Sequence, residues 1–288
     1  MKPTCFILLI YLLPAYSVFA QKNVVIDNGW QLTGNVKTVI EIEHNKVDTT
    51  VQPYKIDMAQ ADTQYAKFDK DGYLIETGWS INPAFSLIPP PYSKGRKIYH
   101  YNNSGLLTEE RDYKSDTLVE KNEYQYDNKG YKTEMDSYKP NGDLSLKTIF
   151  TCDKKGNVLK KEEVDDYGTP ISEEDFKYDK KGNNIIAEGI YYSNKISYKF
   201  ICKYNEKGKC IEQDIYRSKS DKNYTWKSNN KYDDKGNMIE WDSFKFPVEL
   251  TDQQSETYVY DSHDNWIQCT EMQDGKPDKL TLRTIIYY

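Results

Sequence analysis

Apolar and aromatic residues alternate with polar ones along most of the chain, and no stretch of useful length keeps the spacing of an amphipathic helix. Alternation of this kind gives a β-strand two faces of different character. The alternating runs, about nine to eleven residues long, end in stretches rich in Gly, Asn, Asp, Ser or Pro, which form turns. The pattern therefore predicts an all-β chain of many antiparallel strands.

A tyrosine-rich unit recurs within this pattern: Tyr-x-Tyr-Asp-x-x-Gly-Asn, then a short apolar step, then Glu. Its glycines are spaced mostly 25 to 28 residues apart, with one longer step of 33, and Asp264 stands where an eighth glycine is expected. A fixed period in this range indicates one supersecondary unit copied in tandem. The glycines are Gly72, Gly105, Gly130, Gly156, Gly182, Gly208 and Gly236.

The motif predicts a hairpin turn in each copy. In Asp127-Asn-Lys-Gly130, a type I turn is closed by glycine at a position with positive φ. The aspartate side chain is expected to accept hydrogen bonds from backbone N–H groups ahead of it. We assign the same structural roles to the other turn residues, which include Asp153, Asp179 and Asp233.

The hairpin register separates two faces. It places Tyr126 opposite Lys132 and Tyr124 opposite Glu134, so both tyrosines share one face. On the other face it pairs lysines with aliphatic residues: Lys177 with Ile185, Lys203 with Ile211 and Lys231 with Ile239. The tyrosine face is either a core, if the sheet curls around it, or an exposed stacking surface.

Each unit supplies two strands, so the chain is expected to form one long antiparallel meander of about 16–18 strands. Strands twist relative to one another, and a sheet this wide therefore curls into an open spiral or a barrel-like sheet. An opening unit is expected at residues 30–45. Irregular insertions are expected at 46–62, 81–95 and 246–254.

Residues 1–20 have the features of a secretory signal peptide: Lys2, the apolar run 6–13, and Val18-Phe19-Ala20 before the cleavage point. We expect an exported protein, periplasmic, extracellular or at the cell surface, whose mature chain (21–288) is a single repeat domain without a transmembrane segment. The formal net charge is -6, and acidic and basic residues are interspersed. Nucleic acid is excluded as a partner because a basic footprint is missing.

Four cysteines follow the signal peptide, and an even count in an exported chain is typical of disulfides. The register argues against them. It places Cys202 and Cys210 diagonally across one hairpin, beyond disulfide reach, and it places Cys269 on the face opposite the tyrosines. With Cys152 two repeats away, four free thiols are predicted.

The repeats carry no catalytic constellation. Of the three histidines, His100 points away from the tyrosine face, and neither a nucleophile motif nor a phosphate loop is present. Glutamates such as Glu76 and Glu134 recur at the same position in five of the eight copies, which is typical of a scaffold position. Asp69-Lys-Asp-Gly72 faintly resembles a calcium loop, but lysine occupies ligand positions. We predict no catalytic residues, no metal and no cofactor.

The motif resembles the YD repeat of the Rhs and teneurin group over roughly residues 65–270. The match is carried by turns such as Asp153-Lys-Lys-Gly-Asn157 and Asp179-Lys-Lys-Gly-Asn183. The chain is also similar to small exported YD-like proteins of Bacteroidetes, through Gly34-Asn-Val-Lys-Thr-Val39, Asn265-Trp-Ile267 and Arg283-Thr-Ile285. The resemblance implies β-strips that wrap, and an association with carbohydrate or cell-surface binding.

A weaker likeness concerns residues 65–79, which resemble one copy of a choline- or glucan-binding repeat ending in Thr-Gly-Trp. Trp79, Trp226 and Trp241 lie outside the Tyr-x-Tyr column and are the predicted sugar-stacking residues. The leading hypothesis is a non-catalytic protein that binds carbohydrate or another envelope component on a β surface. The alternatives are an envelope accessory protein with a protein partner at an edge strand, and a hydrolase with a site in the irregular loops.

Overall fold

The computed structural model describes residues 24–25, 30–44, 47–48, 55–56, 61–81, 94–218, 220–273 and 275–288. Within these ranges the regular structure consists of strands alone. The barrel strands are β3 (Val36–His44), β6 (Ala61–Phe68), β7 (Leu74–Ser80), β8 (Lys94–Tyr101), β9 (Leu107–Lys114), β10 (Thr117–Tyr126), β11 (Lys132–Tyr138), β12 (Leu144–Cys152), β13 (Val158–Val164), β14 (Pro170–Tyr178), β15 (Asn184–Tyr191), β16 (Ile196–Tyr204), β17 (Cys210–Tyr216), β18 (Trp226–Tyr232), β19 (Met238–Lys245), β20 (Glu249–Tyr260), β21 (Trp266–Gln273) and β22 (Lys276–Tyr287).

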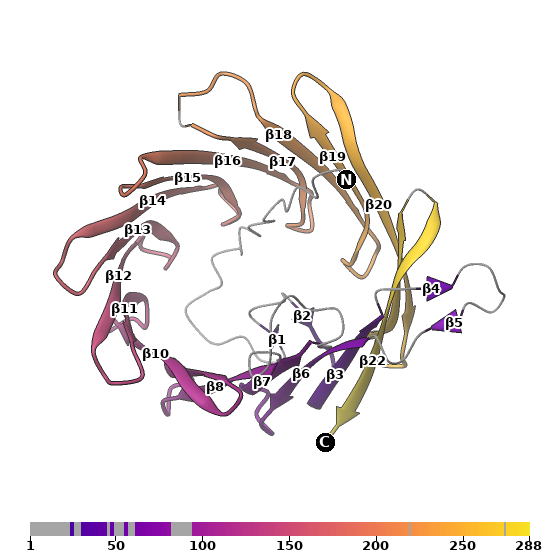
Figure 1. The fold of residues 1–288 in the computed structure, drawn as a ribbon, viewed down its shortest axis with the longest axis horizontal. Helices are drawn as coiled ribbons and strands as arrows, with labels where there is room; N and C mark the ends of the chain where they lie inside the picture. The colour runs from indigo at the N-terminus through magenta and orange to yellow at the C-terminus, as the bar shows by residue number, and fades with distance from the viewer. Residues whose placement is uncertain are drawn as a thin grey trace.

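These 18 strands pair antiparallel with their neighbours in sequence, and β22 then pairs with β3 to close a barrel. Figure 1 shows the strands following one another around a ring. The predicted all-β meander is therefore confirmed, and it closes. Two small two-stranded sheets are not part of the barrel sheet: β1 (Val24–Val25) with β2 (Trp30–Gln31), and β4 (Val47–Asp48) with β5 (Lys55–Ile56). Closure pairs every barrel strand on both sides, which removes the edge strand that a docking partner needs.

Described strands overlap stretches that were predicted to be irregular insertions. Residues 1–20 lie outside the described residues, and so do most of the insertions at 46–62 and 81–95. Strand β8 begins at Lys94, inside the stretch predicted to be irregular. The insertion predicted at 246–254 shrinks to 246–248, because β20 begins at Glu249 and runs for twelve residues.

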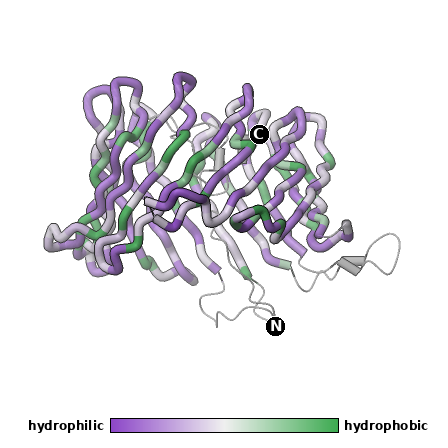
Figure 2. Tube along the Cα trace, turned by 90° about the horizontal axis from the view of Figure 1, so that it is seen from above, coloured by the Kyte–Doolittle hydropathy of each residue, from purple (hydrophilic) through white to green (hydrophobic). Residues whose placement is uncertain are grey.

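The aspartate–glycine turns form as predicted, all at one end of the barrel, which we call the motif rim. Gly130 has φ 83°, and its N–H donates to the carbonyl of Asp127 at 3.0 Å. The Asp127 carboxylate accepts from the backbone N–H groups of Lys129 and Tyr131, both at 2.8 Å. Asp264, in the eighth copy, adopts φ 63° and so replaces glycine. Figure 2 shows that the hairpin tips are hydrophilic. The opposite end of the barrel is called the return rim below.

The predicted register fails one residue beyond each turn. Tyr126 faces Lys132 as expected, but Tyr124 faces Met135 and not Glu134. The reason is a β-bulge that recurs beside the motif turns, where the residue three positions after the glycine has no partner of its own. Pairing is consequently shifted by one residue along the rest of each hairpin. The predicted Lys177–Ile185, Lys203–Ile211 and Lys231–Ile239 pairs are therefore wrong.

The bulge explains the glutamate of the motif. It brings Glu76 opposite Lys67, Glu212 opposite Lys203 and Glu240 opposite Lys231. The lysine Nζ lies 2.9 Å from a carboxylate oxygen in the first pair and 2.7 Å in the second. Lys177 has no such partner, because Ile186 stands at the corresponding position. The repeated glutamate is thus a cross-strand ion-pair partner.

The tyrosine face lines the inside of the barrel. Side chains that share this face by register are buried, including Thr148 (0% exposed) and Asn184 (2%). On the other face, the side chain of Lys203 is 66% exposed. Inward side chains converge on a ring while outward ones diverge, so the buried face is the inner face. The tyrosine face is therefore the inner face of the barrel and not an exposed outer surface.

The apolar packing is local, since 18 strands about 4.8 Å apart and tilted by about 40° make a ring roughly 35 Å across. Inward side chains from opposite walls cannot meet over that span. The buried apolar cluster among the described residues occupies one sector, on and beside β3, β6, β7 and β8: Leu32, Val36, Val39, Ala66, Phe68, Leu74 and Tyr99.

A ladder of hydroxyl bonds joins successive hairpins across the inner face. The tyrosine that precedes the first residue of the turn, an Asp or Asn, donates to the carbonyl of the second residue after the previous turn's glycine. Tyr178 donates to Val158 at 2.8 Å and Tyr204 to Asn184 at 2.6 Å. Burial raises the pKa of Tyr178 to about 12, which keeps its hydroxyl protonated as a donor. Cys152 takes the tyrosine position in its copy, and its Sγ lies 3.6 Å from the carbonyl of Lys132.

Replacing Tyr178 with phenylalanine tests the ladder. The change keeps the ring and removes the bond to Val158, so we expect the free energy of unfolding to fall by about 1 kcal/mol. Urea denaturation followed by tyrosine and tryptophan fluorescence measures this. Tyr167→Phe, at a side chain that is 89% exposed, is the control and should be neutral. Equal effects of the two changes would show that the ladder bond does not stabilise the barrel.

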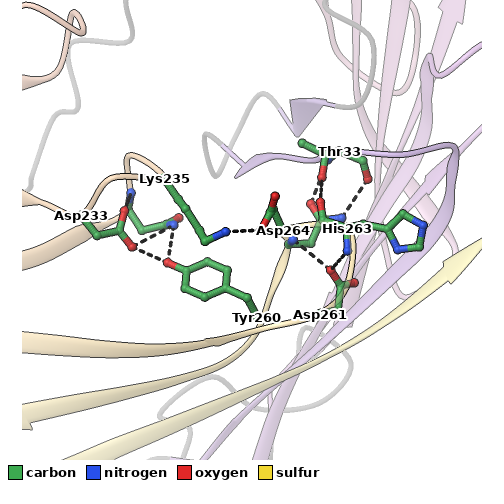
Figure 3. A network of polar contacts seen from close by, with 9 residues as sticks. Thr33, Asp233, Lys235, Tyr260, Asp261, His263 and Asp264 are labelled. Atoms are coloured by element: carbon green, nitrogen blue, oxygen red, sulfur yellow. Dashed lines mark hydrogen bonds and ion pairs between the residues drawn. The ribbon is translucent and has the colours of Figure 1, made fainter.

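The seam between the first and last barrel strands carries its own polar contacts. Asn265, in the eighth turn, exchanges two hydrogen bonds of 2.8 Å with the backbone N–H and carbonyl of Thr33. In Figure 3, Asp261 and His263 lie beside Thr33, and the Lys235–Asp264 ion pair and the Tyr260–Asp233 hydrogen bond link the last two turns of the motif rim. These contacts attach the segment before β3 to the end of the repeat array.

All four cysteines after residue 20 are free thiols, as predicted. The prediction that Cys269 lies on the face opposite the tyrosines was wrong. Cys269 pairs with Tyr258 and therefore lies on the tyrosine face, because the bulge in this hairpin shifts its register. The other three positions agree with the prediction, and Cys210 faces Tyr204.

Candidate functional site

The three predicted binding tryptophans do not form one site. Trp79 lies on β7, whereas Trp226 and Trp241 lie on β18 and β19 at the opposite side of the ring (Figure 1). Trp241 is only 8% exposed, so the expectation that it presents an open stacking surface is wrong. It faces inward because it pairs with Asn230 on the tyrosine face. Trp226 is half-buried, with Lys245 Nζ 5.9 Å from its ring centroid.

Trp79 lines a pocket of about 260 Å³ at the return rim, where β6 and β8 begin and β7 and β9 end. We call it the rim pocket. Strand alternation puts Tyr65 and Trp79 on different faces of the sheet, and both contribute because the pocket is at the end of the wall. Its lining residues are Thr63, Tyr65, Trp79, Ser80, Lys94, Gly95, Arg96, Tyr113, Ser115 and Asp116.

Two glycines inside the strands position the aromatic rings. Gly78 pairs with Tyr65, and a Cβ at Gly78 would lie 2.3 Å from the tyrosine ring. Gly95 pairs with Trp79, and a Cβ there would lie 2.8 Å from the indole. Each ring therefore lies over a glycine on the neighbouring strand, where any side chain would displace it. This arrangement gives the pocket two aromatic walls fixed by the backbone.

Tyr65 is held in place by its hydroxyl. It donates to Glu76 at 2.6 Å, and Lys67 donates to the same carboxylate oxygen at 2.9 Å. Burial and the carboxylate of Glu76 together raise the pKa of Tyr65 to about 12. Burial favours the neutral acid of Glu76, but the hydrogen bonds from Tyr65 and Lys67 outweigh it and lower the pKa of Glu76. The ring edge is thus fixed by groups of the outer wall, and the Tyr65 hydroxyl already has a partner.

The polar side of the pocket carries two cations and one carboxylate. Arg96 lies over the ring of Tyr113, with its Cζ 4.8 Å from the centroid. The Nζ of Lys94 and the Nη2 of Arg96 each lie 3.7 Å from a carboxylate oxygen of Asp116. Asp116 and Ser115 form a two-residue turn with φ 70° and 46°, held to β8 by the Ser115 N–H, which donates to the carbonyl of Lys94.

Comparisons with known proteins gave likenesses to solved structures at low identity. No protein-family model and no curated protein matches the chain. It is similar to a porin-like protein from Bacteroides uniformis, at 12% identity and a TM-score of 0.46, over 88% of this chain and 99% of that chain. A porin-like protein from Bacteroides vulgatus gives 10% identity and a TM-score of 0.28, over 88% and 98%. The structure of TcdB2-TccC3 gives 10% identity and a TM-score of 0.30, over 77% of this chain and 15% of that chain.

These identities and TM-scores are too low for any functional inference, and the YD-repeat resemblance stays a resemblance. The described residues form no helix that is long and apolar enough to cross a membrane. No cluster of three or more His, Cys, Asp or Glu side chains in the described ranges is placed to hold a metal ion.

Sequence reasoning found Trp79 but missed its neighbours Tyr65, Arg96 and Tyr113. A signal was present, because Gly78 and Gly95 interrupt strands and each stands next to a side chain of the pocket, in Gly78-Trp79 and Gly95-Arg96. Only the pairing of β7 with β8 across the 82–93 segment shows that these two glycines are neighbours.

Proposed function

We propose that this protein is an exported, non-catalytic β-barrel that binds carbohydrate in the rim pocket. The observation that supports this most directly is the set of aromatic walls formed by Tyr65, Trp79 and Tyr113 around a pocket with polar side chains at its edge. The apolar C–H face of a sugar ring packs on an aromatic ring while its hydroxyls bond to polar groups, so both surfaces are needed.

The size of the pocket favours a small group. Sites for drug-sized ligands run from about 300 to 1,000 Å³, so 260 Å³ suits a single ring, such as one sugar unit of a longer chain. Export is supported by the signal-peptide sequence of residues 1–20.

The pocket chemistry supports binding over hydrolysis. Glycoside hydrolysis normally uses two carboxyl groups on either side of the scissile bond. Asp116 is the single carboxylate among the described lining residues. Asp116 also lies beside two cations, which favour its ionised form and so disfavour a role as a proton donor.

A glycan array probed with the mature protein tests the proposal. We expect binding that is about tenfold weaker in Trp79→Ala, since loss of one aromatic wall removes roughly 1.4 kcal/mol or more. Trp226→Ala is the matched control, because this tryptophan lies across the ring from the pocket, and its binding should equal that of the native protein. Chromatography should recover the bound glycan uncleaved. An array without any signal, or equal losses in both variants, would refute carbohydrate binding in the rim pocket.

A further inference from the structure

We infer that the rim pocket takes an acidic sugar, a uronic acid unit, whose carboxylate displaces Asp116 from Lys94 and Arg96. This inference rests on the proposed function and specifies its ligand. A uronic acid is distinguished from the corresponding neutral sugar by one feature, a carboxylate beside the ring. The pocket holds cations next to aromatic walls, which matches that combination.

The charge in the pocket is unusual for this protein. The chain has a formal net charge of -6, yet the charged lining residues are Lys94, Arg96 and Asp116, which together carry one net positive charge. The pocket therefore presents a local attraction for an anion on a protein that otherwise repels anions.

Asp116 holds the two cations loosely. Both nitrogen–oxygen distances are 3.7 Å, longer than the 2.7–3.2 Å range of a hydrogen bond. The Asp116 side chain is 73% exposed and is carried by the tight turn at Ser115 and Asp116. An exposed pair of this kind contributes little binding energy, and a carboxylate that makes close contact can replace it.

Arg96 has the geometry to receive that carboxylate. Its guanidinium is stacked on Tyr113, which fixes the plane of the group. Its Nε is buried and has no hydrogen-bond partner. A guanidinium edge presents two parallel N–H groups, and a carboxylate accepts both at once. A uronate stacked on Tyr65 brings its carboxylate toward this edge, because Tyr65 and Arg96 line the same pocket and lie on the same face of the sheet.

Isothermal titration calorimetry with trigalacturonic acid and with its methyl ester tests the inference. The two probes have the same sugar rings and differ at the carboxyl groups, which are charged in the acid and neutral and methylated in the ester, so stacking of the rings is matched between them. We expect the acid to bind at least tenfold more tightly than the ester at low salt, with the preference shrinking as salt is added. Asp116→Asn removes the internal competitor and should tighten binding of the acid several-fold while leaving the ester unchanged. Arg96→Met should abolish the preference.

Two controls separate folding from recognition. Lys114→Met, at an exposed lysine on β9 that does not line the pocket, removes the same charge and should keep the preference. Lys94→Met, at a side chain 60% exposed, should reduce the preference without unfolding the protein. Equal affinity for acid and ester, or an Asp116→Asn variant that binds the acid no better, would overturn the inference. If Trp79-dependent binding of neutral glycans persisted in that case, the proposed function would stand. A glycan array without signal would overturn both.

Discussion

Replacing Arg283 with methionine is expected to lower the free energy of unfolding by about 3–5 kcal/mol. Arg283 on β22 is 7% exposed and contacts Glu41 on β3, with its Nε 2.9 Å from a carboxylate oxygen. Its guanidinium also lies 3.2 Å from the ring centroid of Trp266. Burial lowers the pKa of Arg283 to about 10, and the carboxylate of Glu41 keeps the guanidinium charged well above neutral pH. The pair therefore joins the first and last strands of the ring through a buried contact.

The large effect comes from the charge that is left behind. Burial raises the pKa of Glu41, and Arg283 is the first group that opposes this rise. Without Arg283 the carboxylate is buried beside Glu43 and must take up a proton or draw in water. Adding Glu41→Leu to Arg283→Met removes the orphaned charge, so the double variant should recover most of the lost stability.

Urea denaturation of the two variants measures these changes. The control is Lys203→Met, which breaks the exposed Lys203–Glu212 pair on the outer face and should change the unfolding free energy by less than about 1 kcal/mol. An Arg283→Met protein within 1 kcal/mol of the native protein would show that the seam pair does not hold the ring closed. A double variant no more stable than Arg283→Met would contradict the role assigned to the orphaned carboxylate.

Replacing Asp179 with alanine is expected to lower the free energy of unfolding by about 2–3 kcal/mol at neutral pH, because hydrogen bonds to a charged group are lost. The Asp179 carboxylate accepts from the backbone N–H groups of Lys181 and Asn183 at 2.8 and 2.9 Å. It also accepts from the Asn183 side chain at 2.8 Å. The alanine variant keeps the turn glycine but lacks the carboxylate that accepts these three hydrogen bonds. Asp166→Ala, at an exposed position on the return rim, is the control and should be nearly neutral.

The same residue gives the fold a predictable response to acid. The hydrogen bonds from Asn183 lower the pKa of Asp179 below its usual 3.8, and hydrogen bonds also lower the pKa values of Asp153, Asp233 and Asp261 in other motif turns. A carboxyl group with a lowered pKa stabilises the fold above its usual pKa and ceases to do so as the pH falls through the folded value. The difference between native and Asp179→Ala stability should therefore be constant from pH 7 to about 5 and shrink below about pH 4. A difference that grows in acid would contradict this account.

The turns could be predicted from the sequence because their physics is local. Asp127, two central residues and Gly130 fix the hairpin on their own, and the structure shows the expected bonds. The strand count and the shared tyrosine face follow from the turns by alternation. Asp264 in the eighth turn was found in the same way, since the period marked its position before any geometry was known.

The bulge could not be predicted from the sequence, and it changed the predicted cross-strand pairs in each motif hairpin. The residue three positions after the turn glycine is Ile75 in one copy and Thr133 in another, so its side chain gives no signal. Yet the bulge decides that Lys67 meets Glu76 and that Cys269 faces inward. The motif glutamate was identified as a scaffold position for the right reason, its repetition, without its partner being known.

Two features of the structure, the closed ring and the rim pocket, depend on contacts between residues distant in sequence. The closed ring results from pairing of β22 with β3, which no local pattern specifies. The rim pocket is assembled from four strands, with the 82–93 segment between β7 and β8. The tryptophan prediction treated Trp79, Trp226 and Trp241 alike because composition cannot separate a pocket residue from a buried wall residue such as Trp241.

Residue-resolved amide hydrogen exchange along β22 tests closure of the barrel most directly. Alternate amides of an antiparallel strand face its two neighbours, here β21 and β3. A closed ring predicts slow exchange at every amide of Leu280–Tyr287 that bonds to either neighbour, at rates like those of Val158–Val164 in the middle of the array. Fast exchange at every second amide of β22, with slow exchange at those between, would show an open final edge and contradict the closed barrel.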